Sequence, residues 1–342
     1  MTTPRLADRY RQLRTDPAAR RTLYARAATL AAVRTTLTRA GHIEIDTPLL
    51  QRARRFHPGR SFRTHPHHLP PTTYLRSSTL HLRGMLTAGV ERVYEVGRRF
   101  RDEPSDATHL PEHTLVEIYR AHATYEDMAE LVRELFVAAA LAALGTTRLK
   151  VADGTGIDLA DDPEHLSIHQ ALSCATGTEV TPGTDLDHLR DLADAHDVTL
   201  GPQASADLAL LDLYEHLAEP HLMAPTLVTG FPAGQSPLAK AHPDDDRLAQ
   251  KWDLVIGGVE MATSYTELVD PAELAARLTP PTDGSPPPIE AAGLDEDFVE
   301  VFASSHTTMP PAAGLCIGAD RLVQLLTGAP TVHDALPFGG AW

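Results

Sequence analysis

Two neighbouring stretches of the chain alternate apolar and polar residues, and they constrain the fold more than any other feature. They cover residues 93–103 and 114–122. Successive side chains of a β-strand point to opposite faces, so this alternation predicts two strands that each bury one face. The residues between them include Pro104, Ser105 and Asp106, which are typical of turns. The pattern therefore predicts an antiparallel hairpin.

Helical patterns surround this hairpin. Apolar residues recur at helical spacing over residues 6–39, which predicts two amphipathic helices, and over residues 125–144. The shorter predicted elements are helices over 167–175, 186–196 and 205–216, strands over 42–48 and 254–267, and a strand that runs into a helix over 314–328. Strand hairpins flanked by helices, without regular strand–helix–strand alternation, predict an α+β domain with an antiparallel sheet.

The composition excludes several classes of protein. The chain has 342 residues, which suits one large domain or two small ones. Its only cysteines, Cys174 and Cys316, lack metal-ligand spacing, which argues against a structural zinc site and for a reducing compartment. No apolar stretch reaches the roughly 20 residues of a membrane span, and the N-terminus lacks the apolar core of a signal peptide. We therefore expect a cytoplasmic protein with no membrane contact.

The charge and two biased segments add further limits. The formal net charge is −16, the opposite of the clustered positive charge that non-specific nucleic-acid binding needs. A tRNA partner would therefore need a local basic patch. Residues 52–73 are rich in Arg, His and Pro and predict a loop, and the proline-dense residues 279–292 predict a second loop, which we expect to be mobile.

One face of the hairpin gathers residues whose side chains can take part in binding or catalysis. Arg101 and Glu103 lie two residues apart on the first predicted strand, so they are expected to project from one face. Glu117 and Tyr119 share a face of the partner strand in the same way. That face would hold an arginine, two carboxylates and a phenol. A solvent-exposed strand face has the same composition, so the pattern alone leaves both interpretations open.

Further residues add the chemistry of a nucleotide site. Arg321 lies where a predicted strand passes into a helix, whose start favours anions, and Gly314 and Gly318 before it would let a ligand approach the backbone. Asp253 and Glu260 offer carboxylate oxygens, through which Mg²⁺ is usually held beside nucleotide phosphates. Arginines and acidic metal ligands form the electrostatic arrangement that nucleotidyl transfer requires.

The motifs and their order resemble the catalytic domain of the class II aminoacyl-tRNA synthetases, in particular the lysyl type. Phe100-Arg-Asp-Glu103, followed by residues 109–119, is similar to their motif 2. Residues 314–323 are similar to motif 3, and residues 43–48 resemble motif 1, whose proline lies at the dimer interface. The further segments that match the lysyl type, in the same order, are residues 236–240 and 253–268.

The resemblance implies a class II synthetase catalytic fold, with an antiparallel sheet flanked by helices, and a homodimer formed through motif 1. We expect a helical extension over residues 1–20, one catalytic domain over residues 21–342, and no anticodon-binding domain. The chain is similar in this respect to the stand-alone paralogs typified by elongation factor P lysine ligase, which charge a protein lysine rather than tRNA.

The same resemblance implies ATP and Mg²⁺ as cofactors. The residues expected to bind ATP are Arg101, Glu103, His109, His113, Asp253, Glu260 and Arg321. Arg101 would bind the α-phosphate and the substrate carboxylate, and Arg321 the γ-phosphate, so these two are the expected catalytic residues. Glu103 would contact adenine and His109 the distal phosphates. His113 stands where the family has a phenylalanine that stacks on adenine. The expected Mg²⁺ ligands are Asp253 and Glu260.

A pocket for a lysine-like substrate is also implied. Glu267 and Tyr119 would receive its ε-ammonium, and Glu117 would line the same pocket. A regular strand would point Glu260 and Glu267 to opposite faces, because an odd number of residues separates them. A bulge near residues 263–264 would bring them to one face.

The elements that grip the substrate α-amine in the family are missing. Residues 75–83 contain no acid where the family has a glutamate, and residues 52–60 lack its Gly-Gly-Ala element. One explanation is drift or a compensating acid elsewhere. The other is a substrate whose amine is displaced, modified or absent, such as a β-lysine, an N-substituted lysine or another ω-amino acid.

These observations predict an ATP- and Mg²⁺-dependent ligase that activates lysine or a lysine-like amino acid as its adenylate. The acceptor stays open among an elongation factor P-like protein, a carrier, a small molecule, and a tRNA charged by a truncated lysyl-tRNA synthetase. The alternative from another class is a synthetase-like subunit that binds an amino acid or a nucleotide without catalysis. Retention of the whole phosphate and metal set argues against that alternative.

Overall fold

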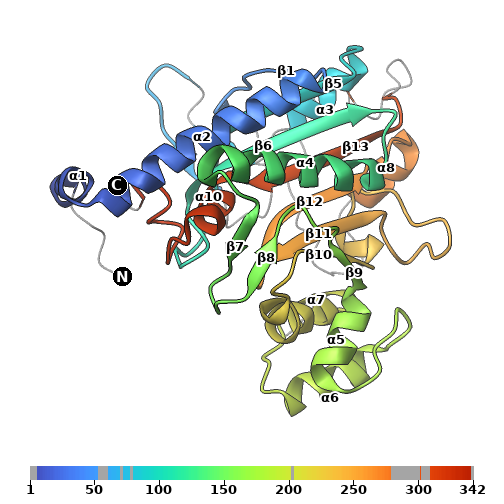
Figure 1. Ribbon diagram of the computed structural model, residues 1–342. Coiled ribbons are helices and arrows are strands. Elements are labelled where there is room, and N and C mark those ends of the chain that lie inside the picture. Colours follow the sequence, from blue (N-terminus) through green and yellow to red (C-terminus); the bar gives the residue numbers. More distant parts are fainter. Residues whose placement is uncertain are drawn as a thin grey trace.

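The computed structural model of the protein describes residues 6–52, 61–69, 72–77, 80–201, 204–278, 301 and 309–339. Its centre is an eight-stranded sheet in the order β1-β5-β6-β13-β12-β11-β10-β9 (Figure 1). The strands are β1 (Ile43–Glu44), β5 (Arg92–Phe100), β6 (Glu112–Ala121), β9 (Glu164–Ser167), β10 (Thr226–Thr229), β11 (Lys251–Ile256), β12 (Val259–Thr266) and β13 (Ala312–Gly318). Neighbours from β5 to β10 pair antiparallel, and only the two edge strands pair parallel. The predicted α+β class is therefore confirmed.

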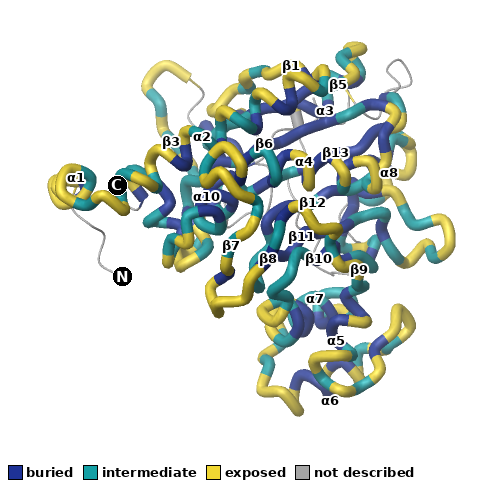
Figure 2. The backbone as a smooth tube through the Cα atoms, viewed as in Figure 1, coloured by how far each residue is buried: buried dark blue, intermediate teal, exposed yellow. Residues whose placement is uncertain are grey.

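Three helices cover one face of this sheet: α2 (Pro17–Arg39), α4 (Tyr125–Leu144) and α10 (Ala319–Thr327) (Figure 1). Their apolar sides and the inward side chains of the central strands form one core, in which Val33 and Leu322 are fully buried. Figure 2 shows the central strands buried and α1 (Leu6–Thr15) largely exposed. The polar side chains of the central strands are left to the opposite face.

The ends of the covering helices follow local capping chemistry. Asp16 precedes α2 and accepts a hydrogen bond from the N–H of Ala18. Thr124 and Asp127 form a capping box at the start of α4, and Gly145 ends that helix with a φ of 73°, which favours glycine. These short-range signals explain why the helices predicted at these places are found.

A second group of helices lies beside the β9–β10 edge of the sheet (Figure 1). It consists of α5 (Ile168–Thr176), α6 (Leu186–Ala195) and α7 (Ala206–Leu217), and each agrees with its predicted range to within one residue. Their own core includes Val228 and Val255 from the sheet. The group therefore packs against the far edge of the sheet from α2.

The remaining elements are short. They are α3 (Leu80–Thr87), α8 (Pro271–Leu278), β2 (Leu50–Gln51), β3 (Arg63–Thr64), β4 (Thr73–Leu75), β7 (Arg148–Lys150), β8 (Gly156–Asp158), η1 (Glu219–His221) and η2 (Ala233–Gln235). The described part of the loop predicted over 52–73 is mostly irregular, as predicted, but Arg63 and Thr64 form β3 and pair with β4. The strand predicted over 42–48 shrinks to β1. Residues 279–292, predicted as a mobile loop, lie outside the described residues. Among the described helices, none is long and apolar enough to cross a membrane.

The predicted hairpin is confirmed as β5 and β6, but its first strand ends at Phe100. Arg101 already leaves the ladder, and its N–H donates to the carbonyl of Pro111 at 2.8 Å. The expectation that Arg101 and Glu103 share a strand face is therefore wrong, because neither residue is part of a strand.

Residues 254–267 form parts of two strands rather than one. β11 and β12 are joined by Gly257 and Gly258, whose φ angles of 63° and 72° suit a tight type I′ hairpin turn. The turn folds β12 back along β11. It thereby places Glu260 beside the strand that carries Asp253.

Candidate active site

A row of polar residues crosses the sheet on the face away from α2 and α4. Cross-strand pairing aligns Glu95, Glu117, Cys316, Thr263 and Asp253, one from each of five adjacent strands. Directly paired residues project from the same face of a sheet. Glu117 and Asp253, which are far apart in the sequence, therefore belong to one surface.

Tyr119 and Glu267 converge on the same face, over Gly314. A Cβ atom on Gly314 would lie 2.8 Å from Glu267 Oε1 and 3.0 Å from Tyr119 Cε1. The expectation that Gly314 makes room for a ligand is therefore wrong, because the glycine makes room for these two side chains. The residues predicted to share a substrate pocket are neighbours, and their role in binding stays a prediction.

A bulge in β12 brings Glu260 to this face. Leu254 pairs with Ala262, but the next residue of β11, Val255, pairs with Glu260, so Met261 is an extra residue. In a regular strand, Glu260 would share the helix-covered face with Ala262, which lies two residues further on and is buried in the main core. The predicted bulge is confirmed, but it lies at Met261 rather than near residues 263–264.

A cavity of about 260 Å³ opens between the loop after β5, the start of α10 and β12. Six of the predicted site residues line it: Arg101, Glu103, His109, His113, Glu260 and Arg321. Gly318, Cys316 and Thr263 contribute to its wall. Asp253, Glu117, Tyr119 and Glu267 are not among the lining residues of this cavity. The structure thus brings the residues predicted for the nucleotide together, apart from Asp253.

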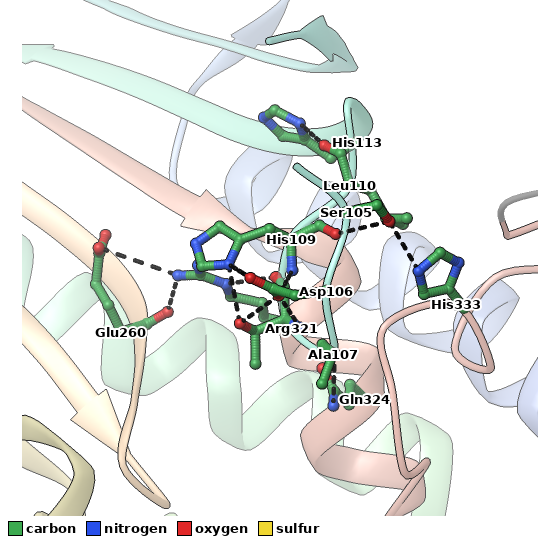
Figure 3. Close-up of polar contacts among 11 residues, drawn as sticks. Ser105, Asp106, Ala107, His109, Leu110, His113, Glu260, Arg321, Gln324 and His333 are labelled. Carbon is green, nitrogen blue, oxygen red and sulfur yellow. Dashed lines mark hydrogen bonds and ion pairs between the residues drawn. The ribbon is translucent and has the colours of Figure 1, made fainter. Parts of the chain in front are cut away.

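Arg321 connects three segments at this cavity (Figure 3). Its Nη1 donates to the carbonyl of Glu260 at 2.6 Å, and its Nε to the carbonyl of Thr108 at 3.2 Å. Its Nη2 lies 2.9 Å from Nε2 of His109, while the Glu260 carboxylate is 4.0 Å from Nη1. Carbonyl oxygens and a ring nitrogen leave most of the guanidinium charge unneutralised, which suits an anionic ligand.

Asp106 orients His109, and sequence reasoning gave Asp106 no role. Its carboxylate lies 2.9 Å from Nδ1 of His109 (Figure 3) and accepts the N–H groups of Thr108 and His109 at 2.7 and 2.8 Å. Desolvation acts to raise the pKa of Asp106, but these hydrogen bonds hold it below its usual range. The carboxylate fixes the ring with Nδ1 protonated, so Nε2 accepts from Arg321. An Asp three residues before a His in a turn segment was the available signal.

His113 is neutral near pH 7. Burial, and then the positive charge of Arg101, lower its pKa to about 4. Its Nδ1 donates to the carbonyl of Leu110 at 3.0 Å, which holds the ring against the cavity. A neutral, fixed imidazole fits the place where the family stacks an aromatic ring on adenine.

Asp253 and Glu260 fit a magnesium ion beside a nucleotide. Asp253 is buried, Lys251 Nζ lies 3.0 Å from its Oδ2, and its Oδ1 makes no hydrogen bond to the described residues. Desolvation raises the pKa of Asp253; Lys251 lowers it, and the neighbouring Glu260 charge raises it further. No group of three or more His, Cys, Asp or Glu suited to a metal occurs in the described part of the chain. Mg²⁺ needs fewer, since it commonly uses one or two carboxylates together with phosphates.

Glu219 adds a further carboxyl group near Asp253 and Glu260, and sequence reasoning missed it. Burial, and then the charges of Glu260, Asp253 and Glu215, raise its pKa to about 8. A buried carboxyl group whose pKa is raised by neighbouring negative charges marks a place where a cation would be stabilising. The acidic end of the site therefore supports the same fit to Mg²⁺.

The two glutamates predicted for the substrate pocket, Glu267 as a partner of the ammonium and Glu117 as a lining residue, each contact an arginine of the chain itself. Glu117 Oε1 lies 3.0 Å from Arg99 Nε, and Glu267 Oε2 lies 3.1 Å from Arg83 Nε. Burial, and then the charges of both glutamates, raise the pKa of Tyr119 well above its usual value. Sequence reasoning gave neither arginine a role, because pairs so distant in sequence leave no local pattern.

Comparison with known proteins covers almost the whole chain. Residues 2–341 match the family model described as "tRNA synthetases class II (D, K and N)". Among curated proteins, the chain is 38% identical over 343 residues to the lysylphosphatidylglycerol biosynthesis bifunctional protein LysX of Gordonia bronchialis, and 40% identical to that of Mycobacterium avium. The matches cover 98% of this chain but only 30% and 28% of those proteins. The chain thus spans less than a third of the length of these relatives.

Proposed function

Because the chain belongs to the class II tRNA synthetase family (D, K and N), we propose that it is a ligase that activates lysine or a lysine-like amino acid with ATP. The product would be the aminoacyl adenylate, which then passes its acyl group to an acceptor other than tRNA. The observation that carries the proposal is the cavity lined by Arg101, His109 and Arg321, with Glu260 and the nearby Asp253 as its acidic side.

The proposed reaction is a nucleophilic displacement at phosphorus. A substrate carboxylate oxygen forms a bond to the α-phosphorus, and the bond to the bridging oxygen of the β-phosphate breaks to release pyrophosphate. Arg101 would stabilise the charge on the α-phosphate, and Arg321 would hold the distal phosphates with His109. Asp106 keeps His109 in place for that contact. The enzyme needs no covalent nucleophile for this step.

The residues present would also hold Mg²⁺, which the family uses with ATP. Asp253 and Glu260 would supply its protein ligands, and the ion would neutralise phosphate charge. Lys251 contributes by holding one oxygen of Asp253 in place.

Support for a lysine-type substrate comes from the relatives. Their name concerns the biosynthesis of lysylphosphatidylglycerol, a lipid in which lysine is joined to phosphatidylglycerol. This supports amino-acid transfer in general terms. A protein lysine, a carrier and a small molecule all stay possible acceptors of this chain's product.

We propose, further, a homodimer formed through the motif 1 region. Ile43, Leu49 and Leu50 are exposed apolar side chains there, which is consistent with a partner surface. The single catalytic domain over 21–342 with an extension over 1–20, and the cytoplasmic location, stay predictions from the sequence.

ATP–pyrophosphate exchange tests the proposed activity. The purified protein with Mg²⁺ should exchange labelled pyrophosphate into ATP in the presence of at least one member of a panel of lysine, β-lysine, Nε-acyl-lysines and norleucine. Omission of the amino acid and an Arg101→Ala variant should both abolish the exchange. No exchange with any acid of the panel, although ATP binds, would favour the non-catalytic binding subunit.

A further inference from the structure

The polar face beyond the cavity carries several buried charges that pair with one another among the described residues. Arg76 lies 2.8 Å from Glu95, and Arg99 bridges Glu95 at 3.4 Å and Glu117 at 3.0 Å. Arg83 and Glu267 form a separate pair at 3.1 Å. These described residues amount to three guanidinium groups and three carboxylates, so their charges balance.

All of these groups are removed from water. The side chains of Arg83 and Glu267 are 1% and 0% exposed, and those of Arg99 and Glu117 are 0% and 9% exposed. Buried charges are tolerated only when they are paired, and removing one partner leaves the other charge uncompensated in a medium of low dielectric constant. Loss of either partner of a pair would therefore destabilise the folded protein.

Arg83 is held by more than its ion pair. Its Nη2 donates to the carbonyl of Leu268, and its Nε also lies 3.4 Å from the sulfur of Met309. Leu268 and Met309 belong to the same apolar cluster as Tyr119, which lies against Glu267 over Gly314. The guanidinium group is thus fixed inside the pocket that the resemblance assigns to a substrate ammonium.

We propose, on the basis of the function proposed above, that the substrate is a lysine-like amino acid whose side chain ends in an uncharged group, because Arg83 and Arg99 already supply the cations that Glu267 and Glu117 require. A terminal amide or an apolar tip would leave both ion pairs intact. An ε-ammonium would add one positive charge to a balanced, buried set.

Two non-reactive analogues of the adenylate test the proposed substrate class by binding alone, without the activation reaction. Norleucyl- and lysyl-sulfamoyl adenosine share the adenosine part and the chain length, and they differ in the terminal ammonium. Titration calorimetry on the full chain should give a dissociation constant at least tenfold lower for the norleucyl compound. Equal affinity, or tighter binding of the lysyl compound, would overturn the inference.

Variants of Arg83 link this preference to the internal cation. Arg83→Met removes the charge at similar length, so a ligand ammonium can replace it, and we expect lysyl-sulfamoyl adenosine to bind at least tenfold more tightly than it binds to the unsubstituted protein. Arg83→Lys is the matched control, because it keeps a cation there and should show no such gain. If Arg83→Met is unstable, the double variant Arg83→Met/Glu267→Gln restores charge balance and should still prefer the norleucyl compound.

The outcomes separate the inference from the proposed function. Tight binding of the norleucyl compound without pyrophosphate exchange for any acid would refute the activity and support the substrate class. Exchange that is best with lysine would support the activity and overturn the substrate class. Binding of neither analogue, to the unsubstituted protein or to Arg83→Met, would count against both.

Discussion

The cavity around Arg321 and the buried pairs around Arg99 lie on one face of the same sheet, but they hold their charges in opposite ways. In the cavity, Arg321 contacts carbonyl oxygens and a histidine, and the nearest Glu260 carboxylate oxygen is 4.0 Å away. Behind it, Arg99 is fully buried between Glu95 and Glu117. The cavity therefore offers positive charge to a ligand, whereas the buried pairs satisfy their charges within the protein.

This difference means that the same type of substitution should have different consequences in the two regions. A charge removed from the buried pairs should reduce stability, because its partner stays in a medium that cannot solvate it. A charge removed from the cavity should mainly reduce activity, because water can reach the groups that remain. Single substitutions in each region test this contrast.

The largest effect on stability is expected at Glu95, which lies 2.8 Å from Arg76 and 3.4 Å from Arg99. Glu95→Gln keeps the shape of the side chain but leaves both arginines without its charge. We expect the free energy of unfolding, measured by urea denaturation, to fall by about 3–5 kcal/mol. The matched control is Glu112→Gln, whose half-exposed pair with Arg98 should contribute less than about 1 kcal/mol. Equal losses in the two variants would refute the contrast.

The largest effect on activity is expected at Arg321. Arg321→Ala removes the guanidinium that we propose to hold the distal phosphates, and the rate of pyrophosphate exchange should fall by about 10²–10³-fold. The free energy of unfolding should fall by clearly less than in Glu95→Gln. Arg190→Ala, on the exposed side of α6, is the control and should leave the exchange rate unchanged. A loss of stability as large as that at Glu95 would show that Arg321 acts mainly as a structural residue.

A smaller effect is expected at Asp106, which acts through His109 rather than on a ligand. Asp106→Asn removes the carboxylate that holds Nδ1, so the ring is less well fixed toward Arg321. We expect the KM for ATP to rise by about 10- to 100-fold, the range typical of residues that orient a ligating histidine, while kcat changes less. Asp102→Asn is the control on the same loop, since Asp102 is exposed. A fall in kcat at unchanged KM would contradict this positioning role.

The smallest effect concerns His113, whose folded pKa is about 4 against an ordinary value of 6.5. The folded protein binds this proton less readily than the unfolded chain does, so the stability from the neutral ring is complete above pH 6.5 and is lost as the pH falls toward 4. The melting temperature should therefore decrease less between pH 7 and 4.5 in His113→Phe. Part of the pH dependence of the melting temperature should remain in the variant, because the pKa of His42 is also lowered to about 4. Identical pH profiles for the two proteins would show that His113 is not buried as described.

The sequence predicts the elements of this fold better than it predicts how their side chains pair. The hairpin of β5 and β6 and the helices α5, α6 and α7 follow from local periodicity and capping, which short stretches of chain contain in full. The end of β5 at Phe100 does not follow from local periodicity. It is set by Arg101, whose N–H leaves the ladder and donates to a carbonyl of the loop. Alternation in the sequence continues beyond the point where pairing stops.

The candidate site divides in the same way. The residues around the cavity are predictable from motif spacing, and even the bulge in β12 follows from the odd separation of Glu260 and Glu267. The contacts of Arg83 with Glu267 and of Arg99 with Glu117 are not predictable, since they depend on the register of strands and helices that are distant in sequence. The residues that we propose to select the substrate are thus harder to predict from sequence than those that we propose to bind the nucleotide.

The extra residue in β12 separates the sequence spacing of Glu260 and Glu267 from the face on which they lie. Val255 pairs with Glu260 and Leu254 with Ala262, so Met261 occupies no position of its own in the alternation. A deletion of this one methionine, which itself lies in the apolar core, would restore regular pairing and leave both glutamates on their present face. An in-frame loss of this single codon would therefore remove core packing and the bulge, but would keep the acidic group at the cavity.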